Sequence, residues 1–353
     1  MSTNGETRAP RAAPLVEVWR GPLVESRHRG HAAAVDGEGR LVASLGEPET
    51  VTFMRSSAKM HQAIPLVASG AAERFQFTDR EVAVVCGSHS GQDIHAETVA
   101  GMLRKTGLDE SALHCGTHEP FDQQTARELR ERRESPGVLR NNCSGKHAGM
   151  LALAAHLGAP VESYERPEHP VQQAMLETVA RFSGVSAGEI PRGTDGCGVP
   201  VFGLSVRSMA LMFARLVAPP RDFDAATRDA CARVVRAVTA HPEMVGGTRE
   251  RFDTGIMLAA RGRLVSKVGA EGVYAAGILP CDEWPRGLGL AFKIDDGEDR
   301  RARPTVAVEI LRQLGVLGGE SLEAAAPYAS FPVRNHRGEA VGIVRAVFTL
   351  ERT

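Results

Sequence analysis

Apolar and polar residues alternate at both ends of the chain, a pattern typical of half-buried β-strands. Near the N-terminus it predicts strands at residues 15–19, 30–35 and 41–45, with Asp36-Gly37-Glu38-Gly39 as the hairpin turn between the last two. Toward the C-terminus it predicts strands at 264–268, 272–279, 288–294 and 340–350, separated by turns that contain Gly and Pro. We therefore expect both chain ends to supply antiparallel strands.

The middle of the chain has apolar residues at helical spacing. We expect helices near 56–74, 95–106, 124–133, 145–157, 170–182, 203–216, 224–240 and 250–259, and another at 303–314 near the C-terminus. The apolar run at 81–85 predicts one strand between the first two helices. Because the strands at the two ends can meet in one sheet, the predicted class is an α+β fold, sandwich-like in its layers, with packed helices and an inserted helical lobe.

This pattern also predicts the domain organisation. Residues 1–14 are polar and form a predicted disordered tail, and residues 15–353 form a single domain whose mostly helical middle lobe covers about 95–260. We expect a cleft between the lobe and the sheet.

Composition narrows the class of partner. With 42 Lys and Arg against 43 Asp and Glu, the net charge is −1, so no overall field attracts nucleic acid or an anionic membrane surface. No apolar run approaches the roughly 20 residues that cross a bilayer, and the first residues lack the basic and apolar pattern of a secretory signal. Six thinly spread cysteines fit reduced thiols, so we expect a cytoplasmic protein that acts on a small molecule.

The first candidate for chemistry is Arg55-Ser56-Ser57-Ala58-Lys59. Ser56 and Lys59 are spaced i, i+3, so they share one face of a helix. A lysine amine takes a proton from a serine only when it is neutral, which burial and a neighbouring cation such as Arg55 favour. The alternative is that Ser56 caps a helix and Lys59 is solvated.

Two further segments carry similar residue types. Ser88 lies in Gly87-Ser88-His89-Ser90-Gly91, between the predicted strand and a helix, where hydroxyls can face a ligand. Lys267 lies on a late strand among alternating buried positions. An ordinary turn and a lysine that extends to solvent are the alternatives.

A cysteine and lysine cluster is the third candidate. Cys143 and Lys146 are spaced i, i+3 at a predicted helix start, and Cys197 follows Asp195 in a Gly-rich loop. Three interpretations stay open: a cysteine hydrolase dyad of Cys143 with His147, a zinc site that includes both cysteines, or small apolar fillers.

Taken together and in this order, R-S-S-A-K, C-G-S-H-S-G, N-N-C-S-G-K-H, D-G-C-G-V-P and S-K-V-G-A-E-G resemble the inducible, thermolabile rhizobial-type (class 3) L-asparaginases over residues 16 to the C-terminus. That family is similar in fold to serine β-lactamases and glutaminases. The β-lactamase pattern itself matches only in part: Lys267-Val268-Gly269 lacks the hydroxyl of K-[ST]-G, and Lys105-Thr106-Gly107 lies at a predicted helix end.

The resemblance implies hydrolysis of L-asparagine to L-aspartate and ammonia. It implies two serine and lysine tandems, Ser56 with Lys59 and Ser88 with Lys267, as catalytic residues. It also implies one zinc ion per chain, not essential for turnover. The residues that it implies around the metal and the substrate are Cys143, Lys146 and Cys197 as zinc ligands and Asp195 near the metal and the substrate ammonium. Arg55 and His147 are candidates for further contacts with the substrate or its neighbours, and a structural role for both is the alternative.

A homodimer is also expected from the resemblance. Two other functions stay open: a glutaminase or other serine acyl hydrolase, and a non-catalytic module that binds zinc or an amino acid.

Overall fold

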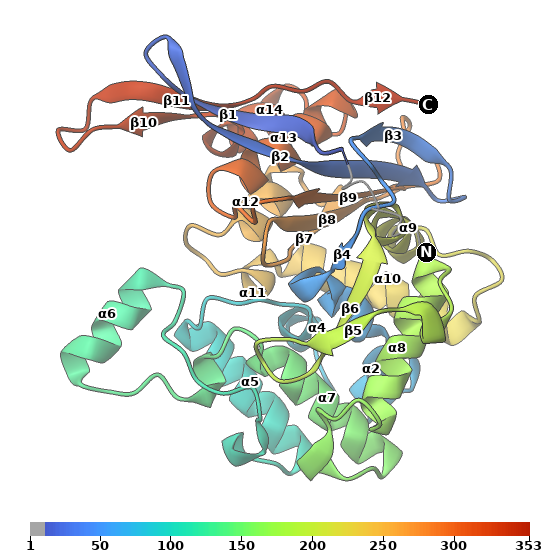
Figure 1. Ribbon diagram of the computed structural model, residues 1–353. Coiled ribbons are helices and arrows are strands. Elements are labelled where there is room, and N and C mark those ends of the chain that lie inside the picture. Colours follow the sequence, from blue (N-terminus) through green and yellow to red (C-terminus); the bar gives the residue numbers. More distant parts are fainter. Residues whose placement is uncertain (1–10) are drawn as a thin grey trace, which may run out of the picture.

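The computed structural model describes residues 11–353 and contains one large antiparallel sheet built from both chain ends (Figure 1). Its 9 strands follow the order β10-β11-β1-β2-β9-β8-β7, and β3 pairs with both β2 and β12. The strands are β1 (Ala13–Arg20), β2 (Leu23–Asp36), β3 (Leu41–Leu45), β7 (Leu264–Val268), β8 (Val273–Ile278), β9 (Leu288–Ile294), β10 (Phe331–Arg334), β11 (Ala340–Ala346) and β12 (Glu351–Arg352). The predicted meeting of the two ends in one sheet is confirmed.

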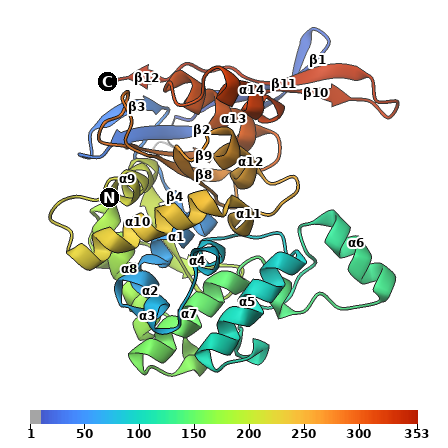
Figure 2. The ribbon, with the colours of Figure 1, turned by 180° about the vertical axis from the view of Figure 1, so that it is seen from behind.

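Helices cover both faces of this sheet and form most of the rest of the chain (Figures 1 and 2). On one side lie α13 and α14, with α12 against α14 and β7. On the other side α9 packs on β2, β8 and β9, with most of the remaining helices beyond it. The helices are α1 (Lys59–Gln62), α2 (Ile64–Ala68), α3 (Ala71–Arg74), α4 (Asp79–Val85), α5 (Asp93–Thr106), α6 (Gln123–Arg132), α7 (Ser144–Leu157), α8 (Pro170–Ser183), α9 (Val206–Val217), α10 (Ala225–Ala240), α11 (Pro242–Val245), α12 (Phe252–Ala259), α13 (Ala302–Gln313) and α14 (Glu320–Ala329). The predicted α+β class, with helices packed on an antiparallel sheet, is confirmed.

The close packing of α9 on the sheet depends on a residue without a side chain. A Cβ added to Gly289 of β9 would lie 1.8 Å from the backbone oxygen of Ala210 in α9. Any larger residue would separate the helix from the sheet, because protein interiors have no spare volume for such an overlap.

One predicted strand is wrong, because residues 81–85 belong to helix α4. Thr78 accepts from the Glu81 amide while the Glu81 carboxylate accepts from the Thr78 amide, which is a capping box that starts a helix. The segment from Val82 to Val85 is buried on all sides, so its apolar run has no polar residue to reveal the period.

Two predicted helices also differ from the structure. The helix expected at 56–74 is a series of short pieces: the 3₁₀ turn η1 (Arg55–Ala58), then α1, α2 and α3, with the left-handed Gly70 before the last. The helix expected from residue 203 begins at Val206, because residues 200–205 form β6 (Pro200–Ser205) in a small sheet with β4 (Val51–Phe53) and β5 (Arg192–Thr194).

The predicted disordered tail, residues 1–14, falls mostly outside the described residues. Its last two residues are a correction, since Ala13 and Pro14 already pair with Gly30 and Arg29 of β2. Within residues 11–353, no helix has the length and apolarity to cross a membrane.

Candidate active site

Ser56 and Ser88 line one cavity of about 470 Å³. Ser56 belongs to η1, which packs against β7 and β8, and Ser88 to the loop between α4 and α5. The turn after β7 and the starts of α12 and α13 supply most of the remaining wall. Segments far apart in the sequence therefore bring the two predicted serines to one cavity.

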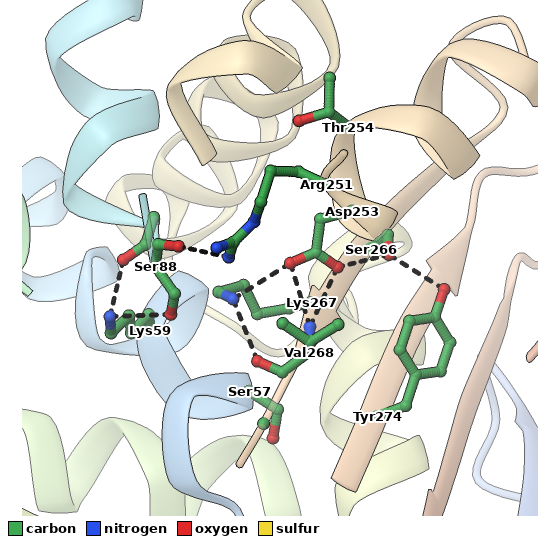
Figure 3. A network of polar contacts seen from close by, with 12 residues as sticks. Ser57, Lys59, Ser88, Arg251, Asp253, Thr254, Ser266, Lys267, Val268 and Tyr274 are labelled. Atoms are coloured by element: carbon green, nitrogen blue, oxygen red, sulfur yellow. Dashed lines mark hydrogen bonds and ion pairs between the residues drawn. The ribbon is translucent and has the colours of Figure 1, made fainter. Parts of the chain in front are cut away.

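Lys59 is the lysine that contacts one of these serines. Its Nζ lies 2.9 Å from Ser88 Oγ and also donates to the carbonyl oxygens of Gly87, at 2.7 Å, and Asn142, at 3.4 Å. The side chain is only 1% exposed. Sequence spacing paired Lys59 with Ser56, but the hydroxyl that it contacts within residues 11–353 is that of Ser88 (Figure 3).

Lys267 has a different partner. Its Nζ lies 3.2 Å from the Asp253 carboxylate and 3.0 Å from the Val268 carbonyl oxygen, and the residue is fully buried. Burial lowers the pKa of Lys267 to about 8, although the Asp253 charge opposes the shift. The predicted contact with Ser88 is replaced by an ion pair with Asp253 (Figure 3).

Asp253 was not predicted, yet it organises this side of the cavity. Its carboxylate accepts hydrogen bonds from Ser266 Oγ at 2.8 Å and from the Val268 amide at 3.0 Å, besides that of Lys267. Ser266 is in turn 3.0 Å from the hydroxyl of Tyr274. These bonds join α12 to β7 and β8 and keep a charged lysine inside the protein.

Arg251, directly before α12, is a second residue that sequence reasoning missed. Its Nη2 donates to the Ser88 carbonyl oxygen at 2.7 Å, and it lines the cavity beside both serines. Burial lowers the pKa of Arg251 from its ordinary value. The stretch Arg251-Phe252-Asp253-Thr254 has no distinctive spacing, so only the packing of α12 on β7 reveals it.

Arg55 holds the backbone before Ser56 in an unusual conformation. Its φ of 52° lies in the left-handed region, which is strained for a residue other than glycine. Its Nε donates to Asp195 at 2.9 Å. This ion pair connects the predicted nucleophile to the Gly-rich loop, and Ser56, Lys146 and Asp195 line one narrow crevice there.

The predicted zinc ligands lie together and are buried. Lys146 Nζ is 3.0 Å from Cys197 Sγ, and Cys143 begins the same helix as Lys146. The hydrogen bond with Cys197, together with Lys59 and Lys146, lowers the pKa of Cys143 against the opposing effect of burial. The same hydrogen bond and burial raise the pKa of Cys197.

The donor atoms of these residues suit zinc, because zinc prefers sulfur and nitrogen ligands and the three side chains offer two sulfurs and one nitrogen. Within residues 11–353, no three His, Cys, Asp or Glu side chains gather to hold a metal, so Lys146 is required as the third ligand. The thiols raise the pKa of Lys146, which burial alone would lower, so zinc must displace a proton to bind there.

His147 lies away from the cavity. It is fully buried, with Nδ1 at 2.6 Å from the hydroxyl of Tyr164, and burial holds its pKa well below the ordinary value. Its predicted contact with substrate therefore has no support in the cavity lining.

The family follows from a comparison of the whole chain. Residues 16–346 match the family model described as L-asparaginase II, which makes the chain an amidohydrolase enzyme. The protein belongs to the L-asparaginase II family. No curated protein matches the chain.

Several solved structures of glutaminases also align with the chain. A probable glutaminase from Bacillus subtilis, complexed with 6-diazo-5-oxo-L-norleucine, is 12% identical over 81% of this chain and 84% of its own, with a TM-score of 0.39. The native form of Mglu is 15% identical over 83% of this chain and 63% of its own, with a TM-score of 0.44.

Proposed function

We propose that this amidohydrolase is an L-asparaginase that forms an acyl-enzyme on a serine. The observation that carries the proposal is the buried amine of Lys59 against a serine hydroxyl at the wall of a cavity that also contains Ser56. A base next to a hydroxyl is the minimum that nucleophilic acyl transfer requires. The family match supports the choice of asparagine as substrate.

Ser56 is the proposed nucleophile. It is half-buried and opens on the cavity, whereas Ser88 is only 4% exposed. The strained backbone at Arg55 orients it, and its amide lies in the first turn of η1, where helical N–H groups have no intrahelical partner. That amide is the proposed donor to the oxyanion.

Lys59 is the proposed general base. A neutral amine has two N–H groups and one lone pair. The carbonyl oxygens of Gly87 and Asn142 accept the two N–H groups, which leaves the lone pair for the Ser88 hydroxyl. Lys59 needs no carboxylate partner in this position, so it can change its charge without breaking an ion pair.

The reaction then proceeds in two halves. Ser56 Oγ attacks the side-chain amide carbon and its proton passes to Lys59; Ser88, bonded to Lys59, relays that proton to the nitrogen, which leaves as ammonia. Water next attacks the ester and gives its proton to Lys59, which returns it to Ser56 Oγ as L-aspartate leaves. Lys267, held as an ammonium by Asp253, supplies positive charge to the cavity wall in both halves.

The proposed zinc ligands are Cys143, Lys146 and Cys197. Zinc would supply a fixed positive charge that orients the polar groups of the substrate. Asp195, which shares a crevice with Ser56 and Lys146, is the proposed partner of the substrate ammonium. The homodimer and the cytoplasmic location remain predictions.

The test measures ammonia release and trapping of the acyl group by hydroxylamine. The wild type should convert L-asparagine and hydroxylamine to β-aspartyl hydroxamate, the product expected when hydroxylamine captures an acyl intermediate. Ser56→Ala should neither release ammonia nor form hydroxamate. Ser88→Ala should still do both, but slowly. Full turnover by Ser56→Ala would eliminate it as nucleophile, and loss confined to Cys143→Ala would favour a cysteine hydrolase.

L-glutamine, assayed in parallel, tests the alternative of a glutaminase. One methylene in a substrate changes the free energy of binding by only about 1 to 3 kcal/mol, so a higher kcat/KM for glutamine would reassign the substrate.

A further inference from the structure

Arg251 has no ion-pair partner within residues 11–353, although it is half-buried at the cavity wall. Its only side-chain hydrogen bond runs from Nη2 to the Ser88 carbonyl oxygen, 2.7 Å away. The guanidinium lies 5.5 Å from the centre of the Phe121 ring, which fixes its plane on one side. Figure 3 shows it beside Ser88 and close to Lys267.

Neighbouring arginines differ from it in this respect. Arg55 pairs with Asp195, Arg303 with Asp299, and Arg249, two residues away, with Asp122. Glu250 precedes Arg251 and lines the same cavity, but it is exposed and no ion pair joins the two within residues 11–353. The other nearby carboxylate is that of Asp253, whose oxygens Lys267, Ser266 and the Val268 amide already occupy. The charge on Arg251 is therefore not neutralised by a carboxylate of its own.

A half-buried guanidinium without an anion loses part of its hydration, and no ion pair compensates that loss. Such a residue at a cavity wall is suited to an anion that arrives with the ligand. The planar guanidinium donates two parallel hydrogen bonds to a carboxylate, which adds geometric selectivity to the charge.

We propose that Arg251 binds the α-carboxylate of the substrate and thereby selects amides of α-amino acids over simple amides. The inference rests on the proposed function. Its substrate, L-asparagine, carries the α-carboxylate on Cα, the same atom that bears the reacting side chain. Arg303 contributes a second donor, because its Nε is buried without a partner among residues 11–353 and it lines the same cavity.

A purely structural role is the competing explanation, since Arg251 also anchors the Ser88 carbonyl oxygen. The two roles differ in what they discriminate. A carboxylate partner affects only substrates that have the carboxylate, whereas a loop anchor affects every substrate equally.

The experiment compares L-asparagine with 3-aminopropanamide, which is asparagine without its α-carboxylate. In Arg251→Met we expect kcat/KM for L-asparagine to fall about 10- to 100-fold, mainly through KM, while that for 3-aminopropanamide changes less than about 3-fold. Arg251→Lys should recover part of the loss, because it restores the charge without the planar pair of donors. Arg249→Met, which removes a paired arginine from the same segment, is the matched control and should retain wild-type preference.

Two results would overturn the inference: an equal loss for both substrates in Arg251→Met, or an unchanged KM for L-asparagine. Calorimetric titration of L-aspartate into wild type and Arg251→Met separates this inference from the proposed function. If the wild type releases no ammonia from L-asparagine, the proposed function fails. The carboxylate subsite would still be supported if the wild type binds L-aspartate and Arg251→Met does not. Equal binding by both proteins contradicts it.

Discussion

Two buried lysines lie close to the candidate site, and their surroundings differ. Within residues 11–353, the oxygens that Lys59 contacts are all neutral: two backbone carbonyls and the hydroxyl of Ser88, with the Cys143 thiol also near it. Lys267 contacts the carboxylate of Asp253 and one carbonyl. Deprotonation of Lys59 breaks no ion pair, whereas deprotonation of Lys267 leaves Asp253 without its buried counter-charge.

The difference assigns different chemistry to the same residue type. A base must exchange its proton in every catalytic cycle, and the environment of Lys59 suits that exchange. A fixed positive charge must persist through the cycle, and the carboxylate beside Lys267 favours that persistence. Variants at each lysine test this division of roles.

The largest expected effect is at Lys59. Lys59→Met should lower kcat for L-asparagine about 10³- to 10⁴-fold, because both proton transfers lose their base. The double variant Ser56→Ala/Lys59→Met should be no slower than either single variant, since the two residues act as one unit. Steady-state ammonia release measures both, and additive losses would contradict a shared step.

The next effect concerns the pH dependence set by Lys267. If its ammonium form is active, the rate falls as pH rises through its pKa of about 8. Asp253 raises that pKa, so Asp253→Asn should move the alkaline limb of kcat to lower pH and lower activity at pH 7 about 10-fold or more.

Ser266→Ala is the control for Asp253→Asn. It removes one hydrogen bond to the Asp253 carboxylate without changing charge, so its alkaline limb should stay in place. The Asp253→Asn variant must first unfold at the same temperature as the wild type. If the alkaline limb of its kcat profile then does not move, a group other than Lys267 sets that limb.

The sequence predicts the terminal strands well because alternation and turns are local properties of each segment. β3, β7 and β9 have the predicted bounds. The strand prediction for residues 81–85 failed because a segment buried on every side has no polar positions from which a helical or strand period can be determined. Pro65 and Gly70 divide the long helix expected at 56–74 into short pieces, and the prediction of one continuous helix gave too little weight to these two helix-breaking residues.

The candidate site shows a different limit of sequence reasoning. Spacing identified Ser56, Lys59, Ser88 and Lys267, since each lies in a segment with unusual residues. It could not predict the contact between Lys59 and Ser88, because that contact depends on how the loop after α4 lies against α1, which no i, i+3 rule describes. Asp253 and Arg251 lack a local motif and become recognisable only when α12 lies beside β7.

Lys146 extends the comparison to a third buried lysine, whose partner is sulfur. Added zinc should raise the Tm of the wild type by several degrees, as ligand at 100 times its Kd stabilises by about 2.7 kcal/mol. Cys197→Ser should show a smaller rise and bind less than one zinc per chain by elemental analysis. Equal zinc content in the two proteins would exclude Cys197 as a ligand.

The smallest effect is expected at Lys105. This residue tests whether a carboxylate partner alone makes a lysine important for activity or stability. Lys105 pairs with Glu81 at 2.6 Å, closer than Lys267 to Asp253, but its side chain is 35% exposed. Solvent screens an ion pair at such a position, so Lys105→Met should change the free energy of unfolding by about 1 kcal/mol or less. Its kcat should stay within about 2-fold of wild type, because it lies outside the cavity. Denaturant titration and ammonia release measure the two quantities, and a loss comparable to that of Asp253→Asn would show that burial is not what distinguishes Lys267.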